Sequence, residues 1–154
     1  MKIGVIADTH GLLDPKVPDF FADVEHILHA GDLGTPAVLA GLENIAPTTA
    51  VLGNVDVGFP LKETEVVELA QKRFFLHHIV NPRALDSSLE ERIRRVKPAV
   101  VVFGHTHKPF CEQIGEVLFL NPGSAGRARF NLPRCLVILH AEGSALRVEY
   151  KSLE

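Results

Sequence analysis

Side chains of types that can bind metals follow short apolar runs at five places along the chain. They are Asp8, His10, Asp32, Asn54, His77, His105 and His107. The set holds carboxylates, imidazoles and one amide but no thiol, which suits divalent cations that prefer oxygen and nitrogen ligands. Because loops after neighbouring strands meet at one rim of a sheet, we expect these side chains to converge. The sequence therefore predicts a metal centre large enough for two cations that share one carboxylate.

Two pairs of these residues have the same spacing. Asp8 and His10 are two apart, as are His105 and His107. At a strand end this spacing turns both side chains to the same side, so one metal can bind both. Gly104 precedes the second pair, and its lack of a side chain would let backbone pack closely beneath the histidines.

The remaining oxygen ligands each follow a glycine. Asp32 could bridge two cations, and Asn54 offers a neutral carbonyl oxygen. Asp56, two residues further on, is expected to orient a neighbouring ligand. Taken alone, a Gly-Asp or Gly-Asn pair is most often a turn. The prediction therefore depends on the whole ordered set, in which every piece follows an expected strand.

The chain reads as one α/β domain over residues 1–154. Continuous apolar runs predict buried strands, and amphipathic segments with capping residues predict helices, the first of them capped by Asp14. The later part looks all-β, so we expect mixed sheets with an antiparallel C-terminal region. Strands are expected at 2–7, 25–30, 48–52, 65–69, 73–77, 99–103, 110–114, 117–120, 135–140 and 145–150, with helices at 15–24, 35–44 and 86–97.

Composition limits the classes of function. The net charge is -3, with 46% hydrophobic and 23% charged residues, so binding to long nucleic acid is disfavoured. No apolar stretch approaches a membrane span, and the N-terminus enters a strand without a signal-peptide core. We therefore expect a cytoplasmic protein that does not bind membranes. The C-terminal strands could offer an edge to a second copy, so a homo-oligomer is a further possibility.

The ordered motifs resemble those of a known superfamily. Asp-x-His, Gly-Asp, Gly-Asn-x-Asp, His and Gly-His-x-His occur in the order typical of calcineurin-like metallophosphoesterases. The short length and the Asn-Pro-Gly-Ser at 121–124 are similar to its small bacterial and archaeal phosphodiesterase branch. The resemblance runs from Ile3 to about Tyr150. It implies a four-layer αββα sandwich of two mixed β-sheets, with a dinuclear site at one rim.

The resemblance also implies roles for the ligands. One metal would be held by Asp8, His10, Asp32 and His107, and the other by Asp32, Asn54, His77 and His105, with Asp32 as the bridge. Manganese is the expected metal, with nickel, zinc, iron and magnesium as alternatives. A hydroxide bridging the two metals would attack phosphorus in line and hydrolyse a P–O ester bond of a small phosphodiester. Asp32, Asn54 and His105 are the expected catalytic residues.

Two positions depart from the family pattern. Many members have a histidine after the asparagine, where it protonates the leaving oxygen, but this chain has Val55. Loss of a general acid costs roughly 10²- to 10⁴-fold, so we expect a preference for good leaving groups and for diesters over unactivated monoesters. His78 stands where the family usually has glycine. It could be a surrogate acid, a substrate contact or a surface residue.

The loop after residue 120 carries further candidates. Asn121, or else Ser124, is expected to form a hydrogen bond beneath the site. Arg127, or Arg129 two residues later, could bind the substrate phosphate, because a guanidinium group suits that geometry. A solvated loop arginine is the alternative interpretation of both.

Two other functions remain open. The retromer scaffold subunit keeps this sandwich with a degraded metal site and works through protein contacts, and Val55 favours that hypothesis. The complete ligand set argues against it, since a pure scaffold needs no such rim. A nuclease or cyclic-nucleotide phosphodiesterase would share the chemistry and differ in substrate, although the acidic balance disfavours long nucleic acid.

Overall fold

The computed structural model describes all of residues 1–154. Ten strands form two five-stranded sheets. The first has the order β10-β9-β1-β2-β3 and contains β1 (Lys2–Ile6), β2 (His26–His29), β3 (Thr48–Ala50), β9 (Cys135–Glu142) and β10 (Ala145–Ser152). The second has the order β4-β5-β6-β8-β7 and contains β4 (Thr64–Leu69), β5 (Lys72–His77), β6 (Val100–Val102), β7 (Phe110–Ile114) and β8 (Val117–Asn121).

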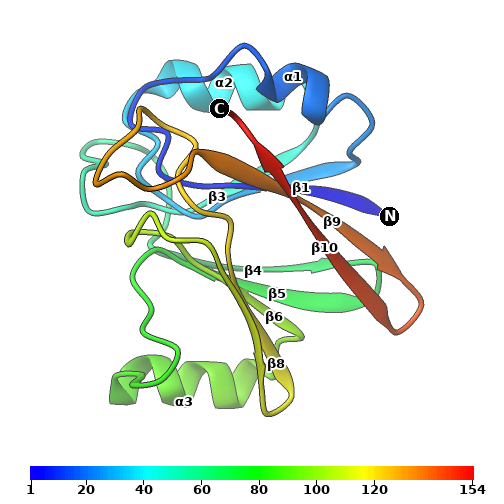
Figure 1. The fold of residues 1–154 in the computed structure, drawn as a ribbon. Helices are drawn as coiled ribbons and strands as arrows, with labels where there is room; N and C mark the ends of the chain where they lie inside the picture. The colour runs from blue at the N-terminus through cyan, green and yellow to red at the C-terminus, as the bar shows by residue number, and fades with distance from the viewer.

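Helices cover the outer faces of both sheets. Figure 1 shows α1 (Val17–Phe20) and α2 (Pro36–Glu43) above the first sheet, and α3 (Ser87–Val96) below the second. The predicted four-layer αββα sandwich of two mixed sheets is therefore confirmed. No helix combines the length and the apolar composition that a membrane span requires.

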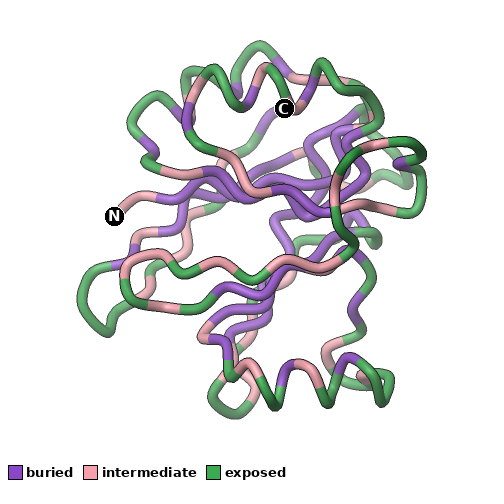
Figure 2. Tube along the Cα trace, turned by 180° about the vertical axis from the view of Figure 1, so that it is seen from behind, coloured by how far each residue is buried: buried purple, intermediate pink, exposed green.

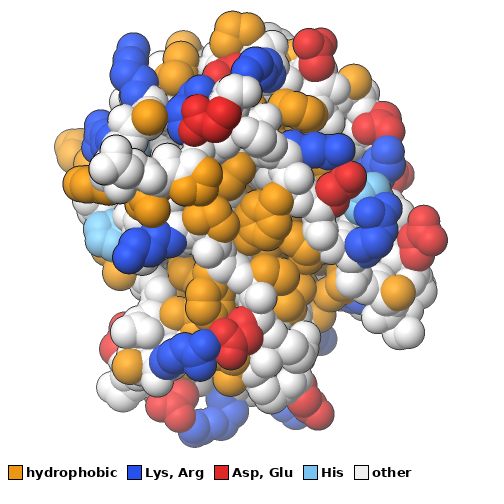
Figure 3. Space-filling view, in the orientation of Figure 1, with side chains coloured by type: hydrophobic (Ala, Val, Ile, Leu, Met, Phe, Trp, Pro, Cys, Tyr) orange, Lys and Arg blue, Asp and Glu red, His pale blue; other side chains and the backbone are white.

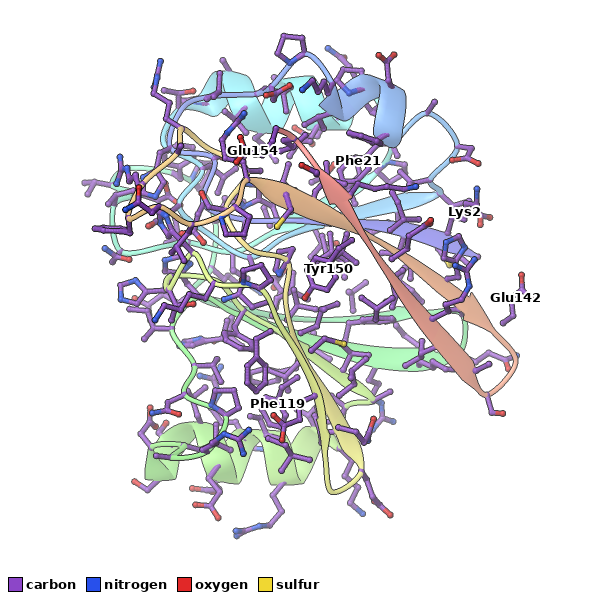
Figure 4. All side chains as sticks on the ribbon, viewed as in Figure 1. Lys2, Phe21, Phe119, Glu142, Tyr150 and Glu154 are labelled. Carbon is purple, nitrogen blue, oxygen red and sulfur yellow. The ribbon has the colours of Figure 1, made fainter.

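Buried side chains form three apolar layers between the four structural ones. The buried backbone in Figure 2 lies mainly along the two sheets, while the helices alternate between buried and exposed residues. In Figure 4, Phe21 lies under the upper helices and Phe119 lies between the second sheet and α3. The layer between the sheets is built largely from valine, leucine and isoleucine. Strands buried on both faces explain why the sequence shows continuous apolar runs.

Parallel pairing brings the functional loops to one rim. β1 pairs parallel with β2, and β2 with β3; in the other sheet β5, β6 and β8 are also parallel neighbours. The carboxyl ends of these six strands therefore lie on one side of the molecule, the left side of Figure 1. The predicted polar residues follow these ends, so the fold itself gathers them.

Tyr150, on the edge strand β10 of the first sheet, connects it to the second sheet near its edge strand β7. Its hydroxyl donates to the carbonyl oxygens of Phe110, at 3.1 Å, and of Asn121, at 2.8 Å. It lies between the sheets in Figure 4, and Figure 3 shows hydrophobic side chains gathered over the same region. The edge strands β10 and β7 thus lie on the same side of the sandwich.

Every predicted strand is present, with ends that differ by at most two residues. The first helix is the main correction, because it covers only Val17–Phe20 instead of residues 15–24. Asp14 does not cap it as predicted. Its carboxylate accepts hydrogen bonds from the Lys16 N–H, at 2.8 Å, and from the guanidinium group of Arg134, at 2.7 Å.

Candidate metal centre

Five of the predicted ligand residues have a left-handed backbone conformation. The φ angles are 54° at Asp8, 47° at His10, 60° at Asp32, 73° at His105 and 63° at His107. Residues other than glycine rarely adopt this conformation, and such strain is concentrated at functional sites. The strands β1, β2 and β6 are therefore each followed by an abrupt turn at residues that the sequence had singled out for their chemistry.

Asp8 lies fully buried at the middle of the cluster. Its Oδ2 accepts a hydrogen bond from the backbone N–H of His105, at 3.0 Å. Its Oδ1 lies 3.5 Å from Nε2 of His107 and 3.8 Å from Nε2 of both His10 and His78. Burial raises the pKa of the Asp8 carboxyl to about 7, because the loss of hydration outweighs the lowering effects of His78 and of the His105 N–H.

Asp32 also lies between two imidazoles. Its Oδ2 is 3.5 Å from Nε2 of His10 and 3.2 Å from Nε2 of His78, while its Oδ1 accepts from the Val55 N–H at 3.0 Å. Burial would raise the pKa of Asp32, but hydrogen bonds from His78 and Val55 outweigh it and the net pKa is lowered. Asp32 was predicted as the carboxylate that two cations could share. Asp8 is placed so that it could be shared in the same way.

His78 has the surroundings of a metal-binding histidine. Its Nδ1 donates to the carbonyl oxygen of Ala30 at 2.7 Å, which leaves Nε2 directed at the cluster. That Nε2 lies 3.0 Å from Oδ1 of Asn54, and Nδ1 of His105 lies 3.1 Å from the same oxygen. Burial alone would lower the pKa of His78, yet the carboxylates that face it raise it.

His77 does not join the cluster, so the prediction that placed it there is corrected. Its Nδ1 lies 2.8 Å from Oγ1 of Thr64 on the neighbouring edge strand. Alternation along β5 explains this, because Leu76 faces the core between the sheets and Phe75 faces α3. His77 continues on the side of Phe75. His78 continues on the side of Leu76 and takes the position predicted for His77.

Asp56 ties two of the ligand loops together. Its buried carboxylate accepts hydrogen bonds from the backbone N–H groups of Leu33, Gly34 and Gly53, at 3.1, 3.0 and 2.9 Å. These groups directly follow Asp32 on one loop and precede Asn54 on the other. This is the position expected of a residue that orients ligands.

Asn121 supports the loop that carries the last two histidines. It is fully buried, and its Nδ2 donates to the carbonyl oxygen of Gly104 and to Oγ1 of Thr106, both at 3.2 Å. Its Oδ1 accepts from the Gly123 N–H at 2.9 Å. It therefore lies beneath the site, where the sequence had put it.

A further supporting pair, Thr9 and His29, escaped the sequence analysis as part of the site. Nδ1 of the buried His29 accepts from the Gly31 N–H at 3.1 Å, so Nε2 carries the proton and donates to Oγ1 of Thr9 at 3.0 Å. The Thr9 hydroxyl then donates to the carbonyl oxygen of Leu33 at 3.0 Å. Burial lowers the pKa of His29 to about 3, so the ring is neutral. The one sequence feature that could have indicated this role is His29 itself, a polar residue inside the apolar run 27–30.

The loop after β8 brings a positive charge and an aromatic ring near the cluster. Burial lowers the pKa of His10, the charge of Asp32 raises it and that of Arg129 lowers it again. The net result is a lowered pKa. Burial and the charges of His10 and Arg129 also lower the pKa of His107. Phe130 lies with its ring 6.0 Å from that of His107 and is 77% exposed. Arg129, one of the two arginines predicted in this loop, therefore lies within electrostatic reach of the cluster.

Unpartnered polar atoms at the centre test whether a cation fits. Oδ1 of Asp8, Nε2 of His10 and Nδ1 of His107 are buried and have no hydrogen-bond partner. Such atoms are costly unless something binds them. Two groups have ligand atoms within 4.8 Å of one another: Asp8, His10 and His107 in one, and Asp8, Asp32 and His78 in the other. Carboxylates and imidazoles in this arrangement fit divalent metals.

Comparison with known proteins agrees with this geometry. The model of the calcineurin-like phosphoesterase superfamily domain matches residues 1–144. A probable metallophosphoesterase from Methanothermobacter thermautotrophicus is 37% identical, over 97% of this chain and 91% of the relative. A phosphodiesterase from Methanocaldococcus jannaschii is 32% identical, over 80% of this chain and 83% of the relative.

Solved structures give the same result for the fold. An archaeal phosphodiesterase superposes with a TM-score of 0.78 at 28% identity, covering 98% of this chain and all 100% of that one. A single-mutant form of Vps29 from Entamoeba histolytica superposes with a TM-score of 0.81 at 25% identity, covering 100% of both chains. The fold, the clustered ligand residues and the family model lead to one conclusion: the chain belongs to the calcineurin-like phosphoesterase superfamily.

Proposed function

We propose that the protein is a metal-dependent phosphodiesterase whose site holds two divalent cations. The observation that carries this proposal is the pair of ligand groups that meet at the buried carboxylate of Asp8. A fully buried carboxylate oxygen without any partner is destabilising unless a cation compensates for it. The phosphodiesterase relative supports the same class of reaction.

The residues divide into two ligand sets in this proposal. One set is Asp8, His10, Asp32 and His107, and the other is Asp32, Asn54, His78 and His105, with Asp8 close to both. Bound cations, with manganese the expected one, would lower the pKa of a shared water and neutralise charge on the phosphoryl oxygens. Asp56, Asn121 and the pair Thr9 and His29 hold the ligand loops in position.

The leaving group receives little help from the chain. Val55 follows Asn54 at the rim, is 46% exposed and cannot donate a proton. Esters whose leaving oxygen needs no protonation should therefore react best. This supports small activated diesters over monoesters with basic leaving groups.

Turnover with defined metals tests the function. Metal-stripped protein should cleave bis(4-nitrophenyl) phosphate once Mn²⁺, Ni²⁺, Zn²⁺ or Mg²⁺ is added, and Asp8→Asn should lose this activity. A dialkyl ester such as diethyl phosphate, whose leaving oxygen is far more basic, should react much more slowly, because Val55 leaves no proton donor beside Asn54. A folded protein without turnover for any of these metals would overturn the proposal.

A protein-binding scaffold on the same fold is the second candidate. Three exposed hydrophobic side chains adjoin ligand residues: Val55 follows Asn54, Ile79 follows His78, and the ring of Phe130 lies 6.0 Å from that of His107. Exposed apolar groups in one region are typical of surfaces that bind a partner. The similarity to Vps29 structures supports this candidate, and it becomes the leading one if the turnover experiment fails.

We expect Arg129, and not Arg127, to attract the anionic substrate electrostatically. We expect Arg129→Gln to raise KM for the anionic diester by about 3- to 5-fold at low salt, with less effect at high salt, because exposed charges are screened. Arg127→Gln, in the same loop, is the matched control and should leave KM unchanged. Equal effects of the two substitutions on KM would show that Arg129 has no special role.

A further inference from the structure

A cavity of about 490 Å³ opens directly beside the metal centre. His105 lines the cavity and also belongs to the centre, where its Nδ1 faces Oδ1 of Asn54. The rings of Phe103 and Phe110 lie 5.9 Å apart in its wall, and Ile79 stands at its edge with 49% of its surface exposed. A substrate whose phosphate reaches the metals could therefore extend into an apolar space without leaving the site.

Charge distinguishes this cavity from a smaller one on the other side of Ile79. The smaller space is about 200 Å³ and is lined by Glu63, whose carboxylate repels an anionic ester. The larger cavity has no acidic residue in its lining, and Lys108 adds a positive charge at its edge. Aromatic and proline rings, with one nearby cation, suit a flat apolar group attached to a phosphate.

We propose that this cavity binds an aromatic arm of the phosphodiester, such as a nucleobase or another planar ring. The inference rests on the proposed function, since the phosphate is assumed to lie at the metal centre. Ile79 would then determine specificity, because it stands at the edge of the cavity next to the centre. Substrates with a small aliphatic arm would leave the cavity empty and bind more weakly.

Binding of two phosphonates, neither of which can be hydrolysed as an ester, tests this. Titrations of ¹⁵N-labelled protein with phenylphosphonate and methylphosphonate, with Zn²⁺ present, give dissociation constants from amide shifts. We expect phenylphosphonate to bind about 10-fold more tightly, because its ring is buried. The amides of Asn81 and Phe110, which line the cavity away from the ligand histidines in the sequence, should respond only to the phenyl compound.

Ile79→Asp should remove most of this preference, since it puts a carboxylate at the edge of the apolar space. Val66→Asp is the matched control, because Val66 is 47% exposed on the edge strand β4 and lies outside the cavity. Equal affinities for the two phosphonates, or a preference that survives Ile79→Asp, would overturn the inference. If the inference fails in this way but the wild-type protein still hydrolyses bis(4-nitrophenyl) phosphate, the proposed function stands. If neither turnover nor binding of either phosphonate is found, both are wrong.

Discussion

His78→Ala is expected to lower diester turnover by about 100-fold or more, whereas His77→Ala should change it by no more than about 3-fold. Removing a residue that merely orients a metal ligand typically costs 10- to 100-fold, so loss of a ligand should reach or exceed the upper end. Nε2 of His78 lies 3.2 Å from Asp32 and 3.0 Å from Asn54. The ring of His77 contacts Thr64 outside the cluster, so its removal should have the small effect of a peripheral substitution.

Metal content decides why activity is lost. His78→Ala should bind less than the full complement of Mn²⁺ after equilibrium dialysis, while His77→Ala should bind as much as the wild-type protein. The two histidines are adjacent, so they share the same local sequence and differ mainly in the face that they occupy. The reverse order of effects, with His77→Ala the inactive variant, would refute the ligand set proposed for this chain.

The error over these two histidines has a physical origin. A strand buried on one face alternates between polar and apolar residues, and the alternation reveals which face is inside. Residues Phe74, Phe75 and Leu76 are all apolar, because β5 packs against the other sheet on one side and against α3 on the other. The sequence pattern therefore could not tell which histidine continues the inner face.

The positions of the strands and the convergence of the other candidate ligands on one rim were easier to predict. Continuous apolar runs marked the buried parallel strands, and parallel strands place their carboxyl ends on one side whatever their exact order. The glycines before Asn54 and His105 also follow from this close packing. A Cβ atom on Gly53 would lie 2.0 Å from Oδ1 of Asp32, and one on Gly104 would lie 2.8 Å from Oδ2 of Asp8.

Contacts between distant loops could not be predicted in the same way. Arg127 and Arg129 occur in one loop, and nothing in its composition says that the charge of Arg129 acts on His10 and His107. The relay from His29 through Thr9 to Leu33 likewise depends on the register of β1 against β2. These details are properties of the assembled rim and not of any single segment.

Asp56→Ala is expected to be the most destabilising single substitution near the site. It would leave the backbone N–H groups of Leu33, Gly34 and Gly53 without an acceptor, and each such group costs about 1 to 3 kcal/mol when buried. Water can reach part of this rim, so a total loss of about 3 kcal/mol is reasonable. For a chain of this size that corresponds to a fall in Tm of roughly 6 to 12 °C in a thermal melt.

The loops that Asp56 joins carry both Asp32 and Asn54, so turnover should fall together with stability. Asp23→Ala is a suitable control, because it removes an exposed carboxylate whose one ion pair, with Lys2, lies at the surface. Surface pairs of this kind contribute little, and neither Tm nor turnover should change measurably. Asp56→Asn keeps one acceptor oxygen and should fall between Asp56→Ala and the wild-type protein in Tm. A Tm for Asp56→Ala equal to that of the wild-type protein would mean that the two loops hold the site without this carboxylate.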